Sequence, residues 1–206
     1  YTYEATTMNI IYILDLIGTA AFAASGAWVG VRKQMDLFGV LVLGAVTAVG
    51  GGTLRDLLLG DIPPFSLKNE SYIYIAIVVS LIVFANRVKF KTFEKPLLYF
   101  DAIGLGTFVV IGTTKALDFH LGLLGAILMG VMTGTAGGVI RDLFANQVPL
   151  IFRREIYASA CVAGGLLLVA LETVGTVRPV AALLSAGTVI SVRLLAIHYN
   201  WALPKS

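Results

Sequence analysis

The sequence predicts an all-α membrane protein of seven transmembrane helices, built as two inverted three-helix repeats followed by a seventh helix. The first observation is composition: 58% of the 206 residues are hydrophobic and 13% are charged, whereas soluble domains are about half apolar and a quarter charged. The second is a series of apolar stretches long enough to cross a bilayer. The third is an internal repeat offset by 86 positions. We therefore expect one transmembrane domain over residues 1–206.

Seven apolar stretches are separated by short loops, and each is interpreted as a helix because spanning requires about 20 mostly apolar residues. The third and sixth are shorter than the others. Prolines mark several boundaries: Pro63-Pro64 follows the second stretch, Pro96 precedes the fourth, Pro149 follows the fifth and Pro179 opens the seventh. The predicted spans are 8–31, 37–59, 72–86, 97–114, 121–145, 156–171 and 177–201.

The internal repeat relates Asp15–Pro63 to Asp101–Pro149, which are identical at 15 of 49 positions without a gap. Each copy is expected to hold three spans, with repeat one over about 8–91, repeat two over about 97–173 and helix seven over about 177–201. Repeats with an odd number of spans insert in opposite orientations. A pseudo-two-fold axis should then lie in the membrane plane, with a site between the copies.

Basic loop residues are distributed unevenly, which orients the helices by the positive-inside rule. One side collects nine: Arg32, Lys33, Arg87, Lys89, Lys91, Lys95, Arg153, Arg154 and Lys205. The other collects three: Lys68, Lys115 and Arg178. We expect a multi-pass protein of the inner (cytoplasmic) membrane with its N-terminus outside and its C-terminus in the cytoplasm. This distribution also explains the pI near 9.0 without nucleic-acid binding.

Adjacent glycines lie in the middle of the second and fifth spans, where they lower the cost of bending or breaking a helix. A break frees backbone carbonyls at the negative end of a half-helix, and such carbonyls suit a cation. Thr47 and Thr133 lie one turn before and can add hydroxyls. The alternative role for glycines is close helix packing. The expected break residues are Gly50, Gly51, Gly52, Gly137 and Gly138, with cation-binding carbonyls at Val49, Gly50, Ala136 and Gly137.

Charged residues inside membrane spans are costly and are candidates for function. Arg55 and Asp56 point about 100° apart on a helix, so they are poorly placed to satisfy each other. Matching depths instead predict that Asp15 pairs with Arg55 and Asp101 with Arg141, one cluster near each mouth of a path. The aspartates are expected to raise the local cation concentration in the path, and the arginines to hold the bends and gate it. The alternative is that these pairs only join helices. The set is Asp15, Arg55, Asp56, Asp101, Arg141, Asp142 and Arg193.

The segments GGGTLRDLLLG (Gly50–Gly60) and GTAGGVIRDLFANQVP (Gly134–Pro149), in a duplicated seven-span chain, resemble the prokaryotic branch of the trimeric intracellular cation (TRIC) channel family. The resemblance covers essentially the whole chain. It implies a homotrimer in which each protomer has its own pore, lined by bent second and fifth helices and conducting K⁺ and Na⁺. Ala136 stands where the first copy has Gly50, which implies a gentler second bend. The Lys-rich motif of the animal members' fifth helix is not seen.

The resemblance leaves a second reading open, because bacterial relatives of this family are also called glycine transporters. A secondary transporter of a small polar solute such as glycine is therefore the alternative to a passive channel. An enzyme is not expected, since His120 and His198 stand apart from any acid–nucleophile set. Cys161 is alone, so neither a disulfide framework nor a metal site is expected. We expect no cofactor beyond permeating K⁺ or Na⁺ and bound lipid, and no nucleic-acid partner.

Overall fold

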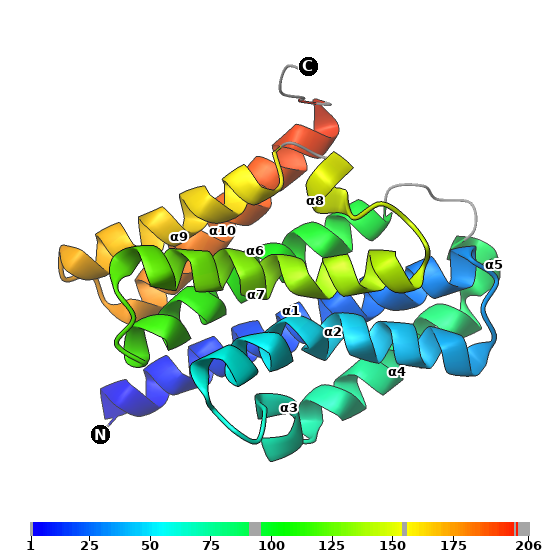
Figure 1. The fold of residues 1–206 in the computed structure, drawn as a ribbon, viewed down its shortest axis with the longest axis horizontal. Helices are drawn as coiled ribbons and strands as arrows, with labels where there is room; N and C mark the ends of the chain where they lie inside the picture. Colours follow the sequence, from blue (N-terminus) through cyan, green and yellow to red (C-terminus); the bar gives the residue numbers. More distant parts are fainter. Residues whose placement is uncertain (1, 91–95, 154–155, 200, 202–206) are drawn as a thin grey trace.

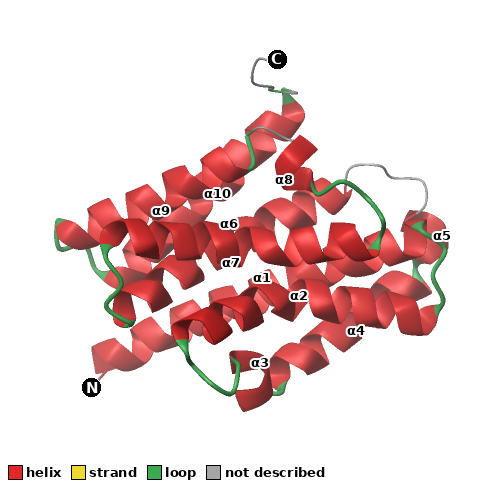
Figure 2. Cartoon of the chain, in the orientation of Figure 1, coloured by secondary structure: helices red, strands yellow, loops and turns green. Residues whose placement is uncertain are grey.

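The computed structural model describes residues 2–90, 96–153, 156–199 and 201. In this part of the chain every regular element is a helix (Figures 1 and 2). The elements are α1 (Thr2–Arg32), α2 (Leu37–Leu59), α3 (Phe65–Lys68), α4 (Ser71–Ala85), α5 (Arg87–Phe90), α6 (Pro96–Asp118), α7 (Leu123–Phe144), α8 (Leu150–Arg153), α9 (Ala158–Thr173) and α10 (Arg178–His198). The loop lysines Lys91 and Lys95, together with Arg154 and Lys205, lie outside the described residues.

Five of these helices, namely α1, α2, α6, α7 and α10, are long and apolar enough to cross a membrane. The helices α4 and α9 are apolar but have 15 and 16 residues. They fall within a few residues of the predicted third and sixth spans, and α2 has the predicted bounds. The chain is thus an all-helical membrane protein.

The order of long and short helices occurs twice along the chain. Two long helices, a four-residue helix and a shorter apolar helix follow one another as α1–α4 and again as α6–α9. Figure 1 shows α2 and α7 side by side with their colours in opposite order, so the two helices run in opposite directions. The last helix, α10, stands outside this pattern and packs on α6 and α9.

Equivalent residues of the two repeats meet in the core. The rings of Phe22 in α1 and Phe108 in α6 stand 86 positions apart in sequence, and their centroids are 5.2 Å apart. A side chain added at Gly104 would overlap the Phe22 ring, and one at Gly18 would press on Thr107 and Phe108. These glycines therefore let α1 and α6 approach closely, as small residues do in membrane helices.

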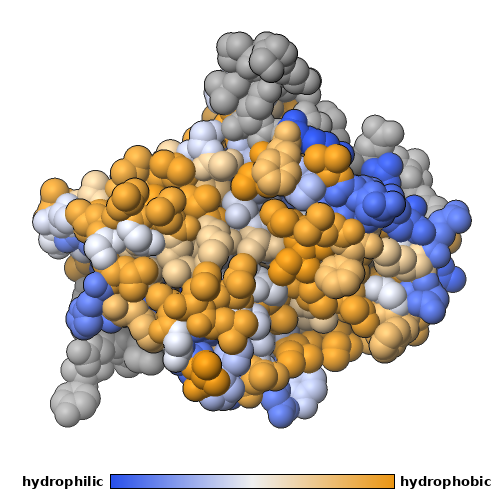
Figure 3. Space-filling model, in the orientation of Figure 1, coloured by the Kyte–Doolittle hydropathy of each residue, from blue (hydrophilic) through white to orange (hydrophobic). Residues whose placement is uncertain are grey.

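The two ends of the helix bundle differ in charge. We call the end with the α2–α3 turn the Asp61 end; Lys68, Lys115 and Arg178 lie there, near the ends of α3 and α6 and the start of α10. We call the opposite end, with α5 and α8, the Arg153 end. Apolar side chains cover much of the face between the ends, and hydrophilic ones gather beside α5 and α8 (Figure 3). This pattern suits a bundle that crosses a bilayer along its long axis.

Candidate functional site

The helices α2 and α7 cross at backbone contact. A Cβ atom at Gly51 would overlap the carbonyl oxygen of Thr133, and one at Gly137 would overlap the carbonyl oxygen of Thr47. The two contacts are related by the 86-residue offset, so each helix presents the same glycine to the same partner position. This crossing is the centre of the candidate site.

No break interrupts the helices at these glycines. Both α2 and α7 are continuous α-helices through Gly50–Gly52 and through Gly137 and Gly138. The carbonyls of Val49, Gly50, Ala136 and Gly137 therefore lie inside regular helices, where each carbonyl has an N–H four residues ahead. Gly51 and Gly137 serve the close approach of the two helices, the alternative that the sequence left open, and the expected bend stays a prediction.

The two threonines of the expected site are buried beside the crossing. The hydroxyl of Thr47 donates to the Leu43 carbonyl at 2.6 Å, and that of Thr133 donates to the Met129 carbonyl at 2.7 Å. Each is the nearest neighbour of a side chain that would be added at Gly26 or Gly112. The threonine side chains thus pack at helix contacts, and their hydroxyl groups donate hydrogen bonds within their own helices.

Beyond the crossing, each helix carries an arginine and an aspartate that do pair with each other. Arg55 Nε donates to Asp56 Oδ1 at 2.8 Å, and Arg141 Nε donates to Asp142 Oδ1 at 2.8 Å. The expectation that sequence neighbours would be poorly placed to pair is wrong. The long arginine side chain folds back beside the next residue and presents its fork of N–H donors there. All four side chains are at most 2% exposed.

The second carboxylate oxygen of each aspartate holds a short helix in place. Asp56 Oδ2 accepts the backbone N–H of Phe65, the first residue of α3, at 2.7 Å. Asp142 Oδ2 accepts the backbone N–H of Leu150, the first residue of α8, at 2.8 Å. Sequence reasoning missed this role. The available signal was the proline seven residues after each aspartate, Pro63 and Pro149.

Of the two ion pairs expected between helices, one forms. Arg141 Nη1 lies 2.7 Å from Asp101 Oδ1 and also donates to the Ser25 hydroxyl, so α7, α6 and α1 are joined. This pair was predicted correctly. The pair between Asp15 and Arg55 was not, because Asp15 accepts from the Tyr72 hydroxyl at 3.0 Å instead.

Arg55 has other partners besides its neighbouring aspartate. Its guanidinium carbon lies 5.3 Å from the centre of the Phe65 ring, a cation–π distance. In the last helix, Arg193 lies similarly over Tyr157 at 4.8 Å and donates to the Ile156 carbonyl at 2.8 Å. Each buried arginine thus contacts specific polar or aromatic groups, as is typical of charges inside a membrane.

Lys115 is the charged residue that sequence reasoning placed in a loop and that the fold brings to the site. From the last turn of α6, its Nζ reaches Asp56 Oδ1 at 2.6 Å and Asp61 Oδ2 at 2.5 Å. Lys68 also binds Asp61. Hydrogen bonds from these two ammonium groups lower the pKa of Asp61 to about 2, and the bond from Lys115 has the larger effect. At the Asp61 end the ammonium group of Lys115 is therefore shared between Asp56 and Asp61.

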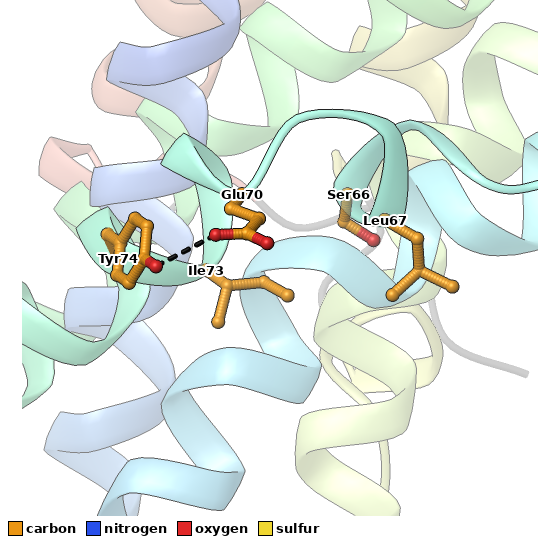
Figure 4. A pocket seen from close by; sticks show the side chains of 5 residues that line it. All are labelled: Ser66, Leu67, Glu70, Ile73 and Tyr74. Carbon is orange, nitrogen blue, oxygen red and sulfur yellow. Dashed lines mark hydrogen bonds between the residues drawn. The ribbon is translucent and has the colours of Figure 1, made fainter.

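A surface pocket lies beside this network on α3 and α4. It has a volume of about 290 Å³ and is lined by Ser66, Leu67, Glu70, Ile73 and Tyr74 (Figure 4). The Tyr74 hydroxyl donates to Glu70 at 2.8 Å within it. None of the predicted site residues lines this pocket. Across the described ranges, no three His, Cys, Asp or Glu side chains are grouped as a metal site would require.

Comparison with known proteins agrees with the fold. A family model described as "Glycine transporter" matches residues 12–87 and 98–173, one match for each repeat. The UPF0126 inner membrane protein YadS of Escherichia coli K12 is 42% identical over 95% of each chain.

Solved structures of similar fold also include members of this family. The TRIC channel orthologue from Rhodobacter sphaeroides has a TM-score of 0.89 and 38% identity, covering 93% of this chain and 99% of the other. A structure described under conductance through TRIC cation channels has a TM-score of 0.86 and 41% identity, covering 94% and 96%. The relatives are membrane proteins and channels, not enzymes.

Proposed function

Because this chain belongs to the family of the prokaryotic TRIC channels, whose family model is described as a glycine transporter, we propose that it is a monovalent cation channel. The permeating ions are K⁺ and Na⁺, and each protomer of a homotrimer has its own path. The observation that carries the proposal is the likeness over 94% of the chain to a TRIC cation channel at 41% identity.

The proposed path runs between α2 and α7, with seven spans and a pseudo-two-fold axis through their crossing. The reciprocal contacts of Gly51 with Thr133 and of Gly137 with Thr47 support this axis. In this arrangement the path is closed at the crossing, so conduction requires α2 and α7 to part there. Gly50 is the glycine best placed to line the opening. It is half-buried, and a side chain added to it would meet only the tip of Ile140.

The charged residues have a different role in this proposal from the one that the sequence suggested. Asp56 and Asp142 are buried and bind arginines and helix N–H groups. They hold α3 and α8 at the two mouths rather than offering free carboxylates to ions. Asp61 is partly exposed at one mouth, but it is paired there with Lys68 and Lys115.

The alternative is a secondary transporter of a small polar solute such as glycine, and the family description favours it. Helices that cross in opposite directions and open alternately are common in carriers. A carrier shows saturable uptake without unitary currents, whereas a channel shows unitary currents that depend on the ion gradient.

Planar-bilayer recording of the purified protein in asymmetric KCl, followed by glycine uptake into liposomes from the same preparation, tests the proposal. We expect unitary cation currents and no saturable glycine uptake. Gly50→Leu should reduce the current by filling the opening, and Gly187→Leu is the matched control because nothing lies within 4 Å of a side chain added there. Unchanged currents in Gly50→Leu, or glycine uptake without currents, would refute it.

The assembly and its placement in the membrane are part of the same proposal. We propose a homotrimer in the inner membrane with the Asp61 end outside and the Arg153 end in the cytoplasm. The name of the Escherichia coli relative supports this membrane, and the word trimeric describes the Rhodobacter sphaeroides channel. The mass of the protein in mild detergent tests the trimer, and a stable monomer or dimer would contradict it.

A further inference from the structure

The ammonium group of Lys115 sits between two carboxylates at the Asp61 end. It lies 2.6 Å from Asp56 Oδ1 and 2.5 Å from Asp61 Oδ2, and it is the contact that ties the end of α6 to the α2–α3 turn. The Lys115 and Asp61 side chains are 22% and 23% exposed, whereas Asp56 is fully buried. The group is therefore bound at the border between the protein interior and water.

Asp56 does not need Lys115 to satisfy its charge. Its Oδ1 already receives Nε and Nη2 of Arg55, both at 2.8 Å, and its Oδ2 receives the Phe65 N–H. Lys115 is therefore a second cation on an oxygen that is already paired. Asp56 Oδ1 thus accepts charge-assisted hydrogen bonds from two cations at once.

The other repeat does the same anchoring without a lysine. The positions 86 residues away from Lys115 and Asp61 hold Val29 and Gln147, which carry no charge. Val29 packs in a buried apolar cluster with Leu43 and Ala145. Asp142 still holds α8 there. The lysine is thus dispensable for holding the short helix, and its presence at one end only requires another explanation.

A third carboxylate belongs to the same end. Asp15 is 8% exposed, and its Oδ1 has no hydrogen-bond partner in the described chain. Its Oδ2 accepts from Tyr72, whose ring packs on Phe65 with centroids 4.6 Å apart. Three carboxylates, Asp15, Asp56 and Asp61, therefore lie at this end near Arg55, Lys68 and Lys115.

We propose that Asp56 and Asp61 form a binding site for a monovalent cation, and that the Lys115 ammonium is its tethered occupant. This inference rests on the proposed cation path. An alkylammonium and K⁺ carry the same charge and bind the same carboxylate oxygens. While Lys115 is in place, no free cation can bind between the carboxylates, and α6 stays fastened to the α2–α3 turn. When it withdraws, K⁺ or Na⁺ takes its place at the mouth of the path.

The test compares Lys115→Met with Lys68→Met, which removes a lysine that contacts Asp61 but not Asp56. Thermal unfolding of each purified protein in detergent is measured in choline chloride and again in KCl or NaCl at the same ionic strength. A ligand that binds only the folded state raises the unfolding temperature. We expect K⁺ or Na⁺ to stabilise Lys115→Met by several degrees, and to leave the parent and Lys68→Met unchanged.

Three further measurements complete the test. The double variant Lys115→Met with Asp61→Asn should lose the response, and Lys115→Arg, which keeps the charge, should not gain it. An equal unfolding temperature of Lys115→Met in choline and in K⁺ overturns the proposal, as does a larger response to Mg²⁺ than to K⁺. If Lys115→Met does not fold, Lys115→Gln takes its place in the same comparison.

The unfolding measurement does not depend on ion conduction, so the inference and the proposed function fail separately. Absence of unitary currents from every variant would refute the channel, while a K⁺ response of Lys115→Met would still establish the site. In bilayers, a channel released from its tethered cation should carry more current at low KCl than the parent. Parent-like current in Lys115→Met, despite a K⁺ response, would show that the site lies off the path and would overturn the gating role.

Discussion

The crossing of α2 and α7 gives the sharpest test of the packing described above. In Gly51→Ala, the new methyl group would overlap a backbone carbonyl of α7, and in Gly137→Ala it would overlap a backbone carbonyl of α2. A backbone atom cannot rotate away as the tip of a side chain can. The two helices must therefore shift apart, and the variants should be less stable than the parent.

The size of the effect follows from two opposing contributions. Overpacking a close contact costs about 1–3 kcal/mol, whereas alanine in a helix interior is favoured over glycine by about 1 kcal/mol. The second contribution is shared by Gly187→Ala in α10, where the added methyl group meets nothing within 4 Å. The difference between Gly51→Ala and Gly187→Ala therefore isolates the clash, at about 1–3 kcal/mol.

Thermal unfolding in detergent measures this difference. For a chain of this size, 1 kcal/mol corresponds to about 2–4 °C, so Gly51→Ala should unfold roughly 2–12 °C below Gly187→Ala by the overpacking range. Gly125→Ala, whose methyl group would make only ordinary contacts with Leu121, serves as a second control within α7. If Gly51→Ala unfolds at the temperature of both controls, the helices do not cross at Gly51 and the closed path is misplaced.

Three other outcomes follow from the charged residues. Asp142→Ala should lower the free energy of unfolding by about 3–5 kcal/mol, because it leaves a buried arginine unpaired and frees α8. Asp118→Ala is the control, since Asp118 is half-exposed. Equal losses of stability in the two variants would contradict the anchoring role. The lowered pKa of Asp61, about 2 against an ordinary 3.8, stabilises the folded state above the ordinary value and is lost as the pH falls toward 2. The gap in unfolding temperature between the parent and Asp61→Asn should accordingly narrow from pH 5 to about 2, and a gap that is constant over this range would argue against the ion pairs. Finally, an impermeant thiol reagent outside whole cells should label Lys68→Cys but not Arg87→Cys, and the reverse pattern would invert the proposed orientation.

The helical spans and the duplication could be predicted because they depend on local composition and on identity at a fixed offset. The bounds of α2 were predicted to the residue for this reason. The pair of Asp101 with Arg141 could also be predicted, since both depths follow from counting residues along straight helices.

The rest of the site depends on geometry that the sequence does not show. Adjacent glycines permit both a break and a close crossing, and only the position of Thr133 in the partner helix decides between them. The rotamer of Arg55 decides whether it meets its neighbour or Asp15. Lys115 reaches Asp56 because α6 ends beside the α2–α3 turn, a contact between residues that are 59 positions apart.

The pairing of each buried arginine with the next residue also affects how the chain enters the membrane. Arginine and aspartate are costly to insert in a membrane helix, about 2.5–3.5 kcal/mol each at its centre, and Arg55 and Arg141 lie one turn from the ends of α2 and α7. Neighbours in sequence can pair while a helix is still alone in the bilayer, before other helices pack against it. We expect α2 and α7 to insert with their arginines already neutralised by Asp56 and Asp142. The contact of Arg141 with Asp101 joins separate helices and must wait for assembly.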